Sequence, residues 1–238
     1  KSAAQNFENF SFDLIYGLPG QTLNGWHKEL NNALELSGNH MSVYQLTVER
    51  GTEFHRLGVE EVDEERSNEL YNCTQTVLTC AGLPAYEVSN HAKPGFESVH
   101  NLLYWRGDDY IGLGPGAHGR LTLKRNDELL ETEAIQEFRN PNTWLEAVRY
   151  KGGGTQKRRK LGFEERLEEL VLCGLRISKG IDAEQFYRVT GRYLFDHLKK
   201  DRLERLAKGS FIEKSRANLY LTETGLRRLN SVVRALLA

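Results

Sequence analysis

The chain has 238 residues, of which 39% are hydrophobic and 27% are charged, and its formal net charge is −1. This composition is typical of a folded globular protein and excludes a disordered or collagen-like chain. No apolar run approaches the roughly 18 residues that a membrane helix needs, so we expect no membrane span. The three cysteines are too few and too scattered for a disulfide framework or a Cys-x-x-Cys metal site, which fits a reducing compartment.

Charge is distributed unevenly along the chain. Residues 1–150 carry 12 Lys and Arg against 22 Asp and Glu, a net −10, whereas residues 151–238 carry 20 against 11, a net +9. Residues 151–160 (KGGGTQKRRK) combine three glycines with a basic run, which is typical of a flexible linker and could also contact phosphates or propionates. The sequence therefore predicts one domain over 1–150, a linker over 151–160 and a second domain over 161–238.

The first predicted elements form a strand, a helix and a second strand. Residues 10–15 are apolar and suit a strand, which stops at the glycines and proline of residues 17–20. Thr22 is expected to cap a helix that ends near residues 37–38, and the next strand is expected over 41–48. Because such a crossover joins parallel strands, we expect an α/β fold with a right-handed connection.

Asp13 lies inside the first predicted strand. A parallel sheet covered on both faces offers no water, so a buried carboxylate must be satisfied by a ligand or cation, or by backbone N–H groups of the following loop. Ligands of α/β folds bind beyond the carboxyl ends of the strands, where residues 17–20 and Thr47 would lie. This placement favours a binding site over a purely structural role.

The scheme repeats once and then gives way to an unusual stretch. Asp63 is expected to cap a long helix that ends at Gly82, with a strand over 85–88. Residues 87–119 then hold three of the seven histidines and many glycines, without the periodicity of a structural segment. Residues 112–116 (GLGPG) look like a dinucleotide fingerprint, but a proline interrupts them, so we interpret them as a tight loop close to a ligand.

The second domain is predicted to be mostly helical. Helices are expected over 163–175, between Asp182 and Gly191, over 194–207 and from 222 or 223 to 236, with a hairpin over 211–221. Three helices followed by a two-stranded wing indicate a winged-helix-like domain. Such domains can bind nucleic acid, and residues 199–205 are basic. Acidic residues interleave them, however, so nucleic acid is not the partner that we expect.

Four blocks of the sequence resemble a known family. Residues 13–22 (DLIYGLPGQT), 42–47 (SVYQLT), 86–90 (YEVSN) and 112–119 (GLGPGAHG) are similar to the coproporphyrinogen III oxidase-like branch of the radical S-adenosylmethionine (SAM) proteins. The resemblance runs from about residue 10 to the end of the chain. It implies the carboxy-terminal part of a partial (β/α)6 radical SAM barrel, its last strands and an extension, followed by the mostly helical domain.

Within that branch, the run His100-Asn101-x-x-Tyr104-Trp105 is similar to a motif of the HemW-type haem chaperones, whereas the oxidases carry an arginine at the position of His100. The resemblance implies a chaperone that binds haem through these four residues, with His100 as the candidate iron ligand, and passes it to haem-acceptor proteins. An oxygen-independent coproporphyrinogen III oxidase is the first alternative, and a winged-helix nucleic-acid-binding module is the second.

Other roles for these histidines stay open from the sequence. His100 could cap a loop while Trp105 serves as core, and His91 and His118 are rival haem ligands or propionate contacts. Whether the segment is a strand or a helix, His100 and Tyr104 fall on one side of it and can act together.

The resemblance also implies a SAM site lined by Asp13, Thr47 and His118, the latter two through backbone atoms. The family's Cys-x-x-x-Cys-x-x-Cys loop, which binds a 4Fe–4S cluster, does not occur in this sequence. We therefore expect the carboxy-terminal portion of a longer protein, without radical catalysis by itself. A cytoplasmic location is expected, or the mitochondrial matrix for a eukaryotic source, and a homodimer is left open.

Overall fold

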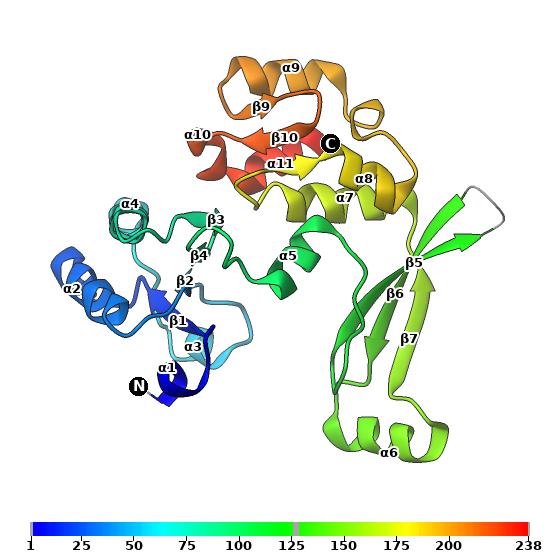
Figure 1. Ribbon diagram of the computed structural model, residues 1–238, viewed down its shortest axis with the longest axis horizontal. Helices are drawn as coiled ribbons and strands as arrows, with labels where there is room; N and C mark the ends of the chain where they lie inside the picture. The colour runs from blue at the N-terminus through cyan, green and yellow to red at the C-terminus, as the bar shows by residue number, and fades with distance from the viewer. Residues whose placement is uncertain (1, 126–128, 238) are drawn as a thin grey trace. The chain divides into compact units, whose positions relative to one another are not determined.

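The structure is a computed structural model that describes residues 2–125 and 129–237 (Figure 1). The chain divides into two compact units, Lys1–Ser98 and Val99–Ala238, and each is described by itself. Within the described ranges, no helix is both long and apolar enough to cross a membrane.

Unit 1 is a four-stranded sheet with helices against one face. Its elements are α1 (Ser2–Asn6), β1 (Ser11–Tyr16), α2 (Leu23–Leu34), β2 (His40–Gln45), α3 (Glu53–Arg56), α4 (Glu64–Cys80), β3 (Ala85–Glu87) and β4 (Asn90–Ala92). β1 and β2 pair in parallel, which confirms the predicted β-α-β unit. Thr22 and Asp63 cap α2 and α4, as predicted, because each side chain accepts a hydrogen bond from a first-turn N–H.

The far half of this sheet differs from the predicted repeat. The strand order is β1-β2-β4-β3, so β4 is inserted between the two strands that were expected to continue a parallel scheme. β4 is antiparallel to both neighbours. The reason is local, since only Val88 and Ser89 separate β3 from β4, and so short a connection can join only antiparallel strands.

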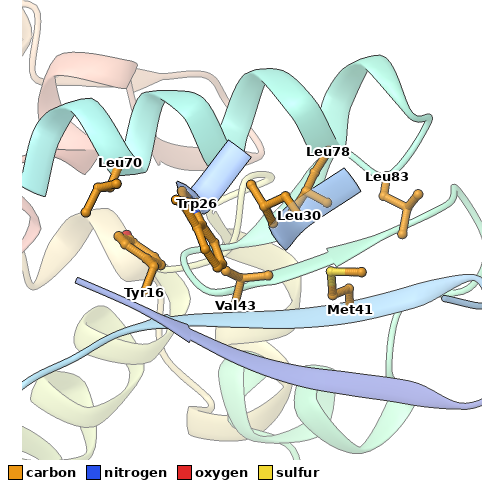
Figure 2. Close-up of a cluster of buried hydrophobic side chains, with 8 residues drawn as sticks. All are labelled: Tyr16, Trp26, Leu30, Met41, Val43, Leu70, Leu78 and Leu83. Carbon is orange, nitrogen blue, oxygen red and sulfur yellow. The ribbon is translucent and has the colours of Figure 1, made fainter. Parts of the chain in front are cut away.

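The core of unit 1 fills the space between the sheet and the helix pair α2 and α4 (Figure 2). Trp26 and Leu30 come from α2, and Leu70 and Leu78 come from α4; all four are fully buried. Burying one such side chain stabilises a fold by about 1.5–3 kcal/mol. The indole Nε1 of Trp26 donates to Thr74 Oγ1 at 2.8 Å, which joins the two helices inside this core.

Unit 2 contains two three-stranded sheets and most of the helices. Its elements are α5 (Val99–Arg106), β5 (His118–Arg125), β6 (Leu129–Glu137), α6 (Pro141–Lys151), β7 (Thr155–Lys160), α7 (Phe163–Gly174), β8 (Ile181–Asp182), α8 (Ala183–Thr190), η1 (Leu194–Asp196), α9 (Lys200–Lys208), β9 (Ile212–Lys214), β10 (Asn218–Leu221), α10 (Glu223–Leu226) and α11 (Leu229–Leu237). The sheet orders are β5-β6-β7 and β8-β10-β9. In Figure 1, α6 lies at one end of the β5-β6-β7 sheet, and α7 to α11 lie at the opposite end.

The predicted linker over 151–160 is wrong. Residues 155–160 form β7, which pairs antiparallel with β6, and the division between compact units falls after Ser98 instead. The basic side chains find acidic partners that the local composition could not reveal: Arg158 pairs with Glu133, and Lys160 with Glu131. The basic run is therefore an edge strand, and carboxylates of β6 form ion pairs with two of its basic side chains.

The carboxy-terminal region keeps the predicted element types with two extra breaks. The side chain of Asp182 caps α8, and β9 and β10 form the predicted antiparallel hairpin. The helix expected over 194–207 is divided into η1 and α9, and the last helix into α10 and α11. Leu194, Leu198 and Leu203 are buried on both sides of the first break, so apolar spacing did not reveal it.

Candidate functional site

The sheet of unit 1 presents a polar face on the side opposite its core. Alternation along β1 turns Ser11, Asp13 and Ile15 away from the helices. In the strand register, Asp13 lies opposite Ser42 on β2, and Ser42 lies opposite Asn90 on β4. Three polar side chains from three strands therefore form one row across this face.

Hydrogen bonds extend this row to a buried carboxylate. Ser42 Oγ donates to Asn90 Oδ1 at 3.0 Å, and Asn90 Nδ2 donates to Glu87 Oε2 at 2.7 Å. The same Glu87 oxygen accepts from the backbone N–H of Ser89 at 3.0 Å. Glu87 is 2% exposed, and its hydrogen bonds to these donors hold the β3–β4 turn in place.

A second polar row lies two residues earlier on β1 and β2, at Ser11 and His40. Ser11 Oγ is 2.7 Å from His40 Nδ1, and His40 Nε2 is 2.8 Å from the hydroxyl of Tyr86. Burial lowers the pKa of His40, and the nearby Asp13 carboxylate opposes that shift. The imidazole is therefore kept neutral and hydrogen-bonded on both sides, next to a negatively charged group.

Asp13 itself differs from the sequence expectation. It is exposed on the polar face rather than buried in a sheet covered on both sides. Ile15 and Tyr44, which face each other across β1 and β2, are also 49% and 40% exposed. The structure differs from the expectation that both faces of the sheet are covered, because α2 and α4 pack against only one of them. Asp13 is instead free to contact a ligand on an accessible surface.

The loop after β1 and the residues after β2 lie at the same edge of the sheet, as predicted. Tyr16 at the end of β1 pairs with Gln45 at the end of β2. Gly17 follows with a positive φ of 79°, and its N–H is held by the side chain of Gln21 at 2.7 Å. Thr47 is exposed two residues beyond β2. Asp13 and Thr47 thus belong to one sheet, with Thr47 beyond its carboxyl edge.

His100 and Tyr104 come together on α5, the first helix of unit 2. Their rings are in edge-to-face contact with centroids 4.7 Å apart, one helical turn apart in sequence. Tyr104 also contacts Tyr110, with ring centroids at 4.4 Å. His100 is exposed, whereas Tyr104 is half-buried. The predicted pairing is confirmed, and the segment is helical.

Asn101 and Trp105, the other two residues of the motif, are half-buried on α5. Arg176 lies over the Trp105 ring with its guanidinium carbon 4.8 Å from the centroid. The indole of Trp105 therefore contacts Arg176 of unit 2, and its role in haem binding or in the core stays a prediction from the sequence.

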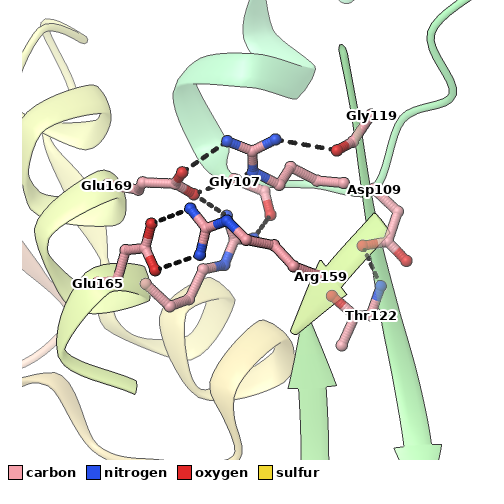
Figure 3. A network of polar contacts seen from close by, with 9 residues as sticks. Gly107, Asp109, Gly119, Thr122, Arg159, Glu165 and Glu169 are labelled. Carbon is pink, nitrogen blue, oxygen red and sulfur yellow. Dashed lines mark hydrogen bonds and ion pairs between the residues drawn. The ribbon is translucent and has the colours of Figure 1, made fainter. Parts of the chain in front are cut away.

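A cavity of about 340 Å³ lies between α5 and α7, and we call it the α5–α7 cavity. Its lining includes Tyr104, Trp105, Tyr110, Arg120, Arg166 and Glu169. Arg120 Nη2 donates to Glu169 Oε1 at 2.7 Å, and Arg120 Nε donates to Glu169 Oε2 at 3.2 Å (Figure 3). Arg166 Nη1 donates to Glu169 Oε2 at 3.2 Å, and Arg166 Nη2 donates to the carbonyl of Gly107. Local sequence patterns did not indicate this network, because its members come from distant segments.

His118 lies at the start of β5 and is exposed. A Cβ added to Gly112 would lie only 2.3 Å from the carbonyl oxygen of His118. The glycine at this position is thus required by the loop's own backbone, not by a ligand. His118 belongs to unit 2, whereas Asp13 and Thr47 belong to unit 1, so the three predicted SAM residues are not joined within one described site.

His91 is not accessible as a haem ligand. It lies on β4, 1% exposed, on the face that packs against the helices. Strand alternation sends His91 inward and its neighbour Asn90 to the polar face. The interpretation of His91 as a rival ligand or propionate contact is therefore wrong for this fold.

Two further observations bear on the alternatives. Across residues 2–125 and 129–237, no group of three or more His, Cys, Asp or Glu side chains is arranged to hold a metal ion. On α9, Arg202 Nη1 donates to the carbonyl of Ala235 at 3.0 Å. One of the basic side chains of residues 199–205 is therefore used within unit 2.

Comparison with known proteins identifies relatives along nearly the whole chain. Residues 163–228 match the family model of the HemN C-terminal domain. The chain is 35% identical to the heme chaperone HemW of Bacillus subtilis over 235 residues, which cover 97% of this chain and 59% of that protein. It is 34% identical to the mitochondrial radical S-adenosyl methionine domain-containing protein 1 of Danio rerio, with 95% of this chain and 52% of that protein covered.

A solved structure has a similar fold. Coproporphyrinogen III oxidase (HemN) from Escherichia coli, a radical SAM enzyme, aligns with a TM-score of 0.70 over 95% of this chain and 54% of its own chain, at 16% identity. The chain thus spans a little more than half the length of each of these three proteins.

Proposed function

Because this chain belongs to the HemW- and HemN-like branch of the radical SAM family, as its carboxy-terminal portion, we propose that it binds haem and passes it to acceptor proteins. The observation that carries the proposal is the exposed His100 on α5 with the Tyr104 ring against its edge. This pair stands within the His-Asn-x-x-Tyr-Trp run of a chain whose relatives include proteins named heme chaperone.

The geometry suits reversible binding. A neutral imidazole is a common axial ligand of haem iron, and the half-buried Tyr104 offers an aromatic surface beside it. Because His100 is exposed, haem bound there stays within reach of an acceptor protein. Trp105 is half-buried with Arg176 over its ring, and we assign it to orienting α5 beside this pair. Asn101, half-buried on the same helix, we assign to holding this turn of α5.

We assign SAM to the polar face of unit 1. The Asp13 carboxylate can accept hydrogen bonds from hydroxyl or ammonium groups, and Thr47 lies beyond the carboxyl edge of the same sheet. His118 belongs to unit 2, and its role at SAM stays a prediction from the sequence. In the family, a 4Fe–4S cluster bound by three cysteines supplies the electron that cleaves SAM. The described residues offer no such ligand set, so no radical step is assigned to this chain.

The finer architecture is part of the same proposal. The parallel pair β1 and β2, with α2 between them, corresponds to strands of a partial (β/α)6 barrel whose inner surface is the polar face. The helices α7, α8 and α9 with the β9–β10 hairpin correspond to a winged-helix-like domain. For location we propose the cytoplasm of a bacterium, or the mitochondrial matrix in a eukaryote, as the name of the Danio rerio relative suggests.

The experiment is a haem titration of the protein and of its His100→Ala variant, followed through the Soret band. We expect the variant to bind haem at least about tenfold more weakly and to shift the Soret maximum, because the iron loses its protein ligand. His55→Ala is the control, since His55 is also exposed and lies outside the motif. An unchanged affinity and an unchanged Soret band in His100→Ala would refute the proposal and leave the oxidase alternative.

A further inference from the structure

Two residues that line the α5–α7 cavity each carry a buried N–H group, closed to water, that has no hydrogen-bond acceptor among the described residues: Trp105 Nε1 and Arg166 Nε. Arg166 is 5% exposed, and its two terminal nitrogens are already used by Glu169 and by the Gly107 carbonyl. A buried donor left without an acceptor costs about 1–3 kcal/mol. The cavity therefore favours a guest that carries acceptor oxygens.

The charge of the cavity selects the kind of acceptor. Two guanidinium groups, those of Arg120 and Arg166, line it together with a single carboxylate, that of Glu169. Both guanidinium groups pair with that one carboxylate. One positive charge is thus left in excess in a partly buried space, where a second carboxylate would be stabilised more strongly than a neutral group.

The cavity adjoins the haem ligand. Tyr104 lines it and is also the residue whose ring contacts His100, with centroids 4.7 Å apart. A volume of about 340 Å³ is larger than the roughly 30 Å³ occupied by one water molecule, and it lies within the size range of ligand pockets. One side chain, Tyr104, therefore connects the proposed iron ligand with this cavity.

From these contacts we infer that the α5–α7 cavity takes a propionate carboxylate of the haem whose iron His100 binds. Trp105 Nε1 and Arg166 Nε donate to its oxygens, and the excess charge of Arg120 and Arg166 balances it. The inference rests on the proposed haem-binding function and deepens it, because it makes the acidic side chains of the porphyrin a determinant of recognition.

The test compares haem with haem dimethyl ester, in which both propionates are esterified, on the unaltered protein and on Trp105→Phe. Phenylalanine keeps an aromatic ring at position 105 and removes the Nε1 donor. We expect the protein to bind haem about tenfold to a hundredfold more tightly than the diester, since a hydrogen bond to a charged group contributes about 1.5–3 kcal/mol. Trp105→Phe should weaken haem binding about tenfold and leave diester binding unchanged.

Trp144→Phe is the matched control, because its indole already donates to Glu137 at 3.0 Å and lies outside the cavity lining. Equal affinity of the unaltered protein for haem and diester would overturn the inference. That comparison needs no variant, so a folding defect in Trp105→Phe cannot obscure it. Failure of the unaltered protein to bind either porphyrin would instead contradict the proposed function, and the inference with it.

Discussion

His91 shows how one buried side chain ties the stability of unit 1 to pH. It is 1% exposed, and its Nδ1 has no partner among the described residues. Burial lowers its pKa from 6.5 to about 4; a hydrogen bond with the Leu83 backbone opposes this shift, while the nearby His40 adds to it. The folded protein therefore keeps this imidazole neutral at pH values where the unfolded chain would protonate it.

We predict that unit 1 loses stability as pH falls from about 6.5 to 4. In that range the unfolded chain binds a proton at His91 and the folded chain does not, so the free energy of unfolding decreases, by about 3 kcal/mol for a shift of this size. His40, whose pKa burial also lowers, adds a loss of the same sign. Urea unfolding at several pH values measures the slope.

Trp26 is the sole tryptophan of unit 1, so a variant with phenylalanine at positions 105 and 144 reports on this unit by fluorescence. In that background, His91→Gln should flatten the pH dependence, whereas His27→Gln, on the exposed side of α2, should not. Equal slopes in both variants would show that His91 is not responsible.

At the scale of elements, the pairing of α2 with α4 depends on a hydrogen bond inside an apolar core. Trp26 Nε1 donates to Thr74 Oγ1 at 2.8 Å, and the threonine hydroxyl donates in turn to the Leu70 carbonyl at 2.8 Å. A hydroxyl at this position fixes the register of the two helices, because an apolar side chain of the same shape would leave the indole N–H without an acceptor.

Thr74→Val is therefore expected to lower the free energy of unfolding of unit 1 by about 1–3 kcal/mol, although the two side chains have similar volumes. Thr79→Val, the same substitution at an exposed position of α4, should change it far less. Urea unfolding followed by Trp26 fluorescence measures both, and equal losses would mean that the effect comes from helix propensity and not from the buried hydrogen bond.

At the scale of the whole molecule, the position of the unit boundary has a direct consequence. The division after Ser98 keeps α5, the two sheets of unit 2 and the carboxy-terminal helices in one unit. Contacts across the predicted linker support this: Arg166 on α7 donates to the Gly107 carbonyl, and Gln185 Nε2 on α8 donates to Asp108 at 2.6 Å. The helical domain predicted over 161–238 would lack these partners.

We predict that a fragment covering Val99–Ala238 folds by itself and unfolds cooperatively, whereas a fragment covering 161–238 does not. The first keeps the core between α5 and α7, and the second exposes the surface of Leu170 that packs beside Gly107. Circular dichroism with thermal unfolding compares them at equal concentration. Cooperative unfolding of the shorter fragment would restore the boundary that composition suggested.

The sequence by itself determined the features that depend on neighbours in the chain. The caps at Thr22, Asp63 and Asp182, the parallel pairing of β1 with β2, and the adjacency of His100 and Tyr104 were all predicted. Each rests on interactions within a few residues or on a single short crossover, which leave a recognisable local pattern.

Only the tertiary structure decided which surfaces are covered and which charges meet. It exposed Asp13, buried His91 between sheet and helices, and turned the basic run of 155–160 into a strand with acidic partners. It also gathered Trp105 and Arg166 around one cavity although 61 positions separate them. These outcomes depend on contacts between residues far apart in sequence, which local composition and periodicity do not encode.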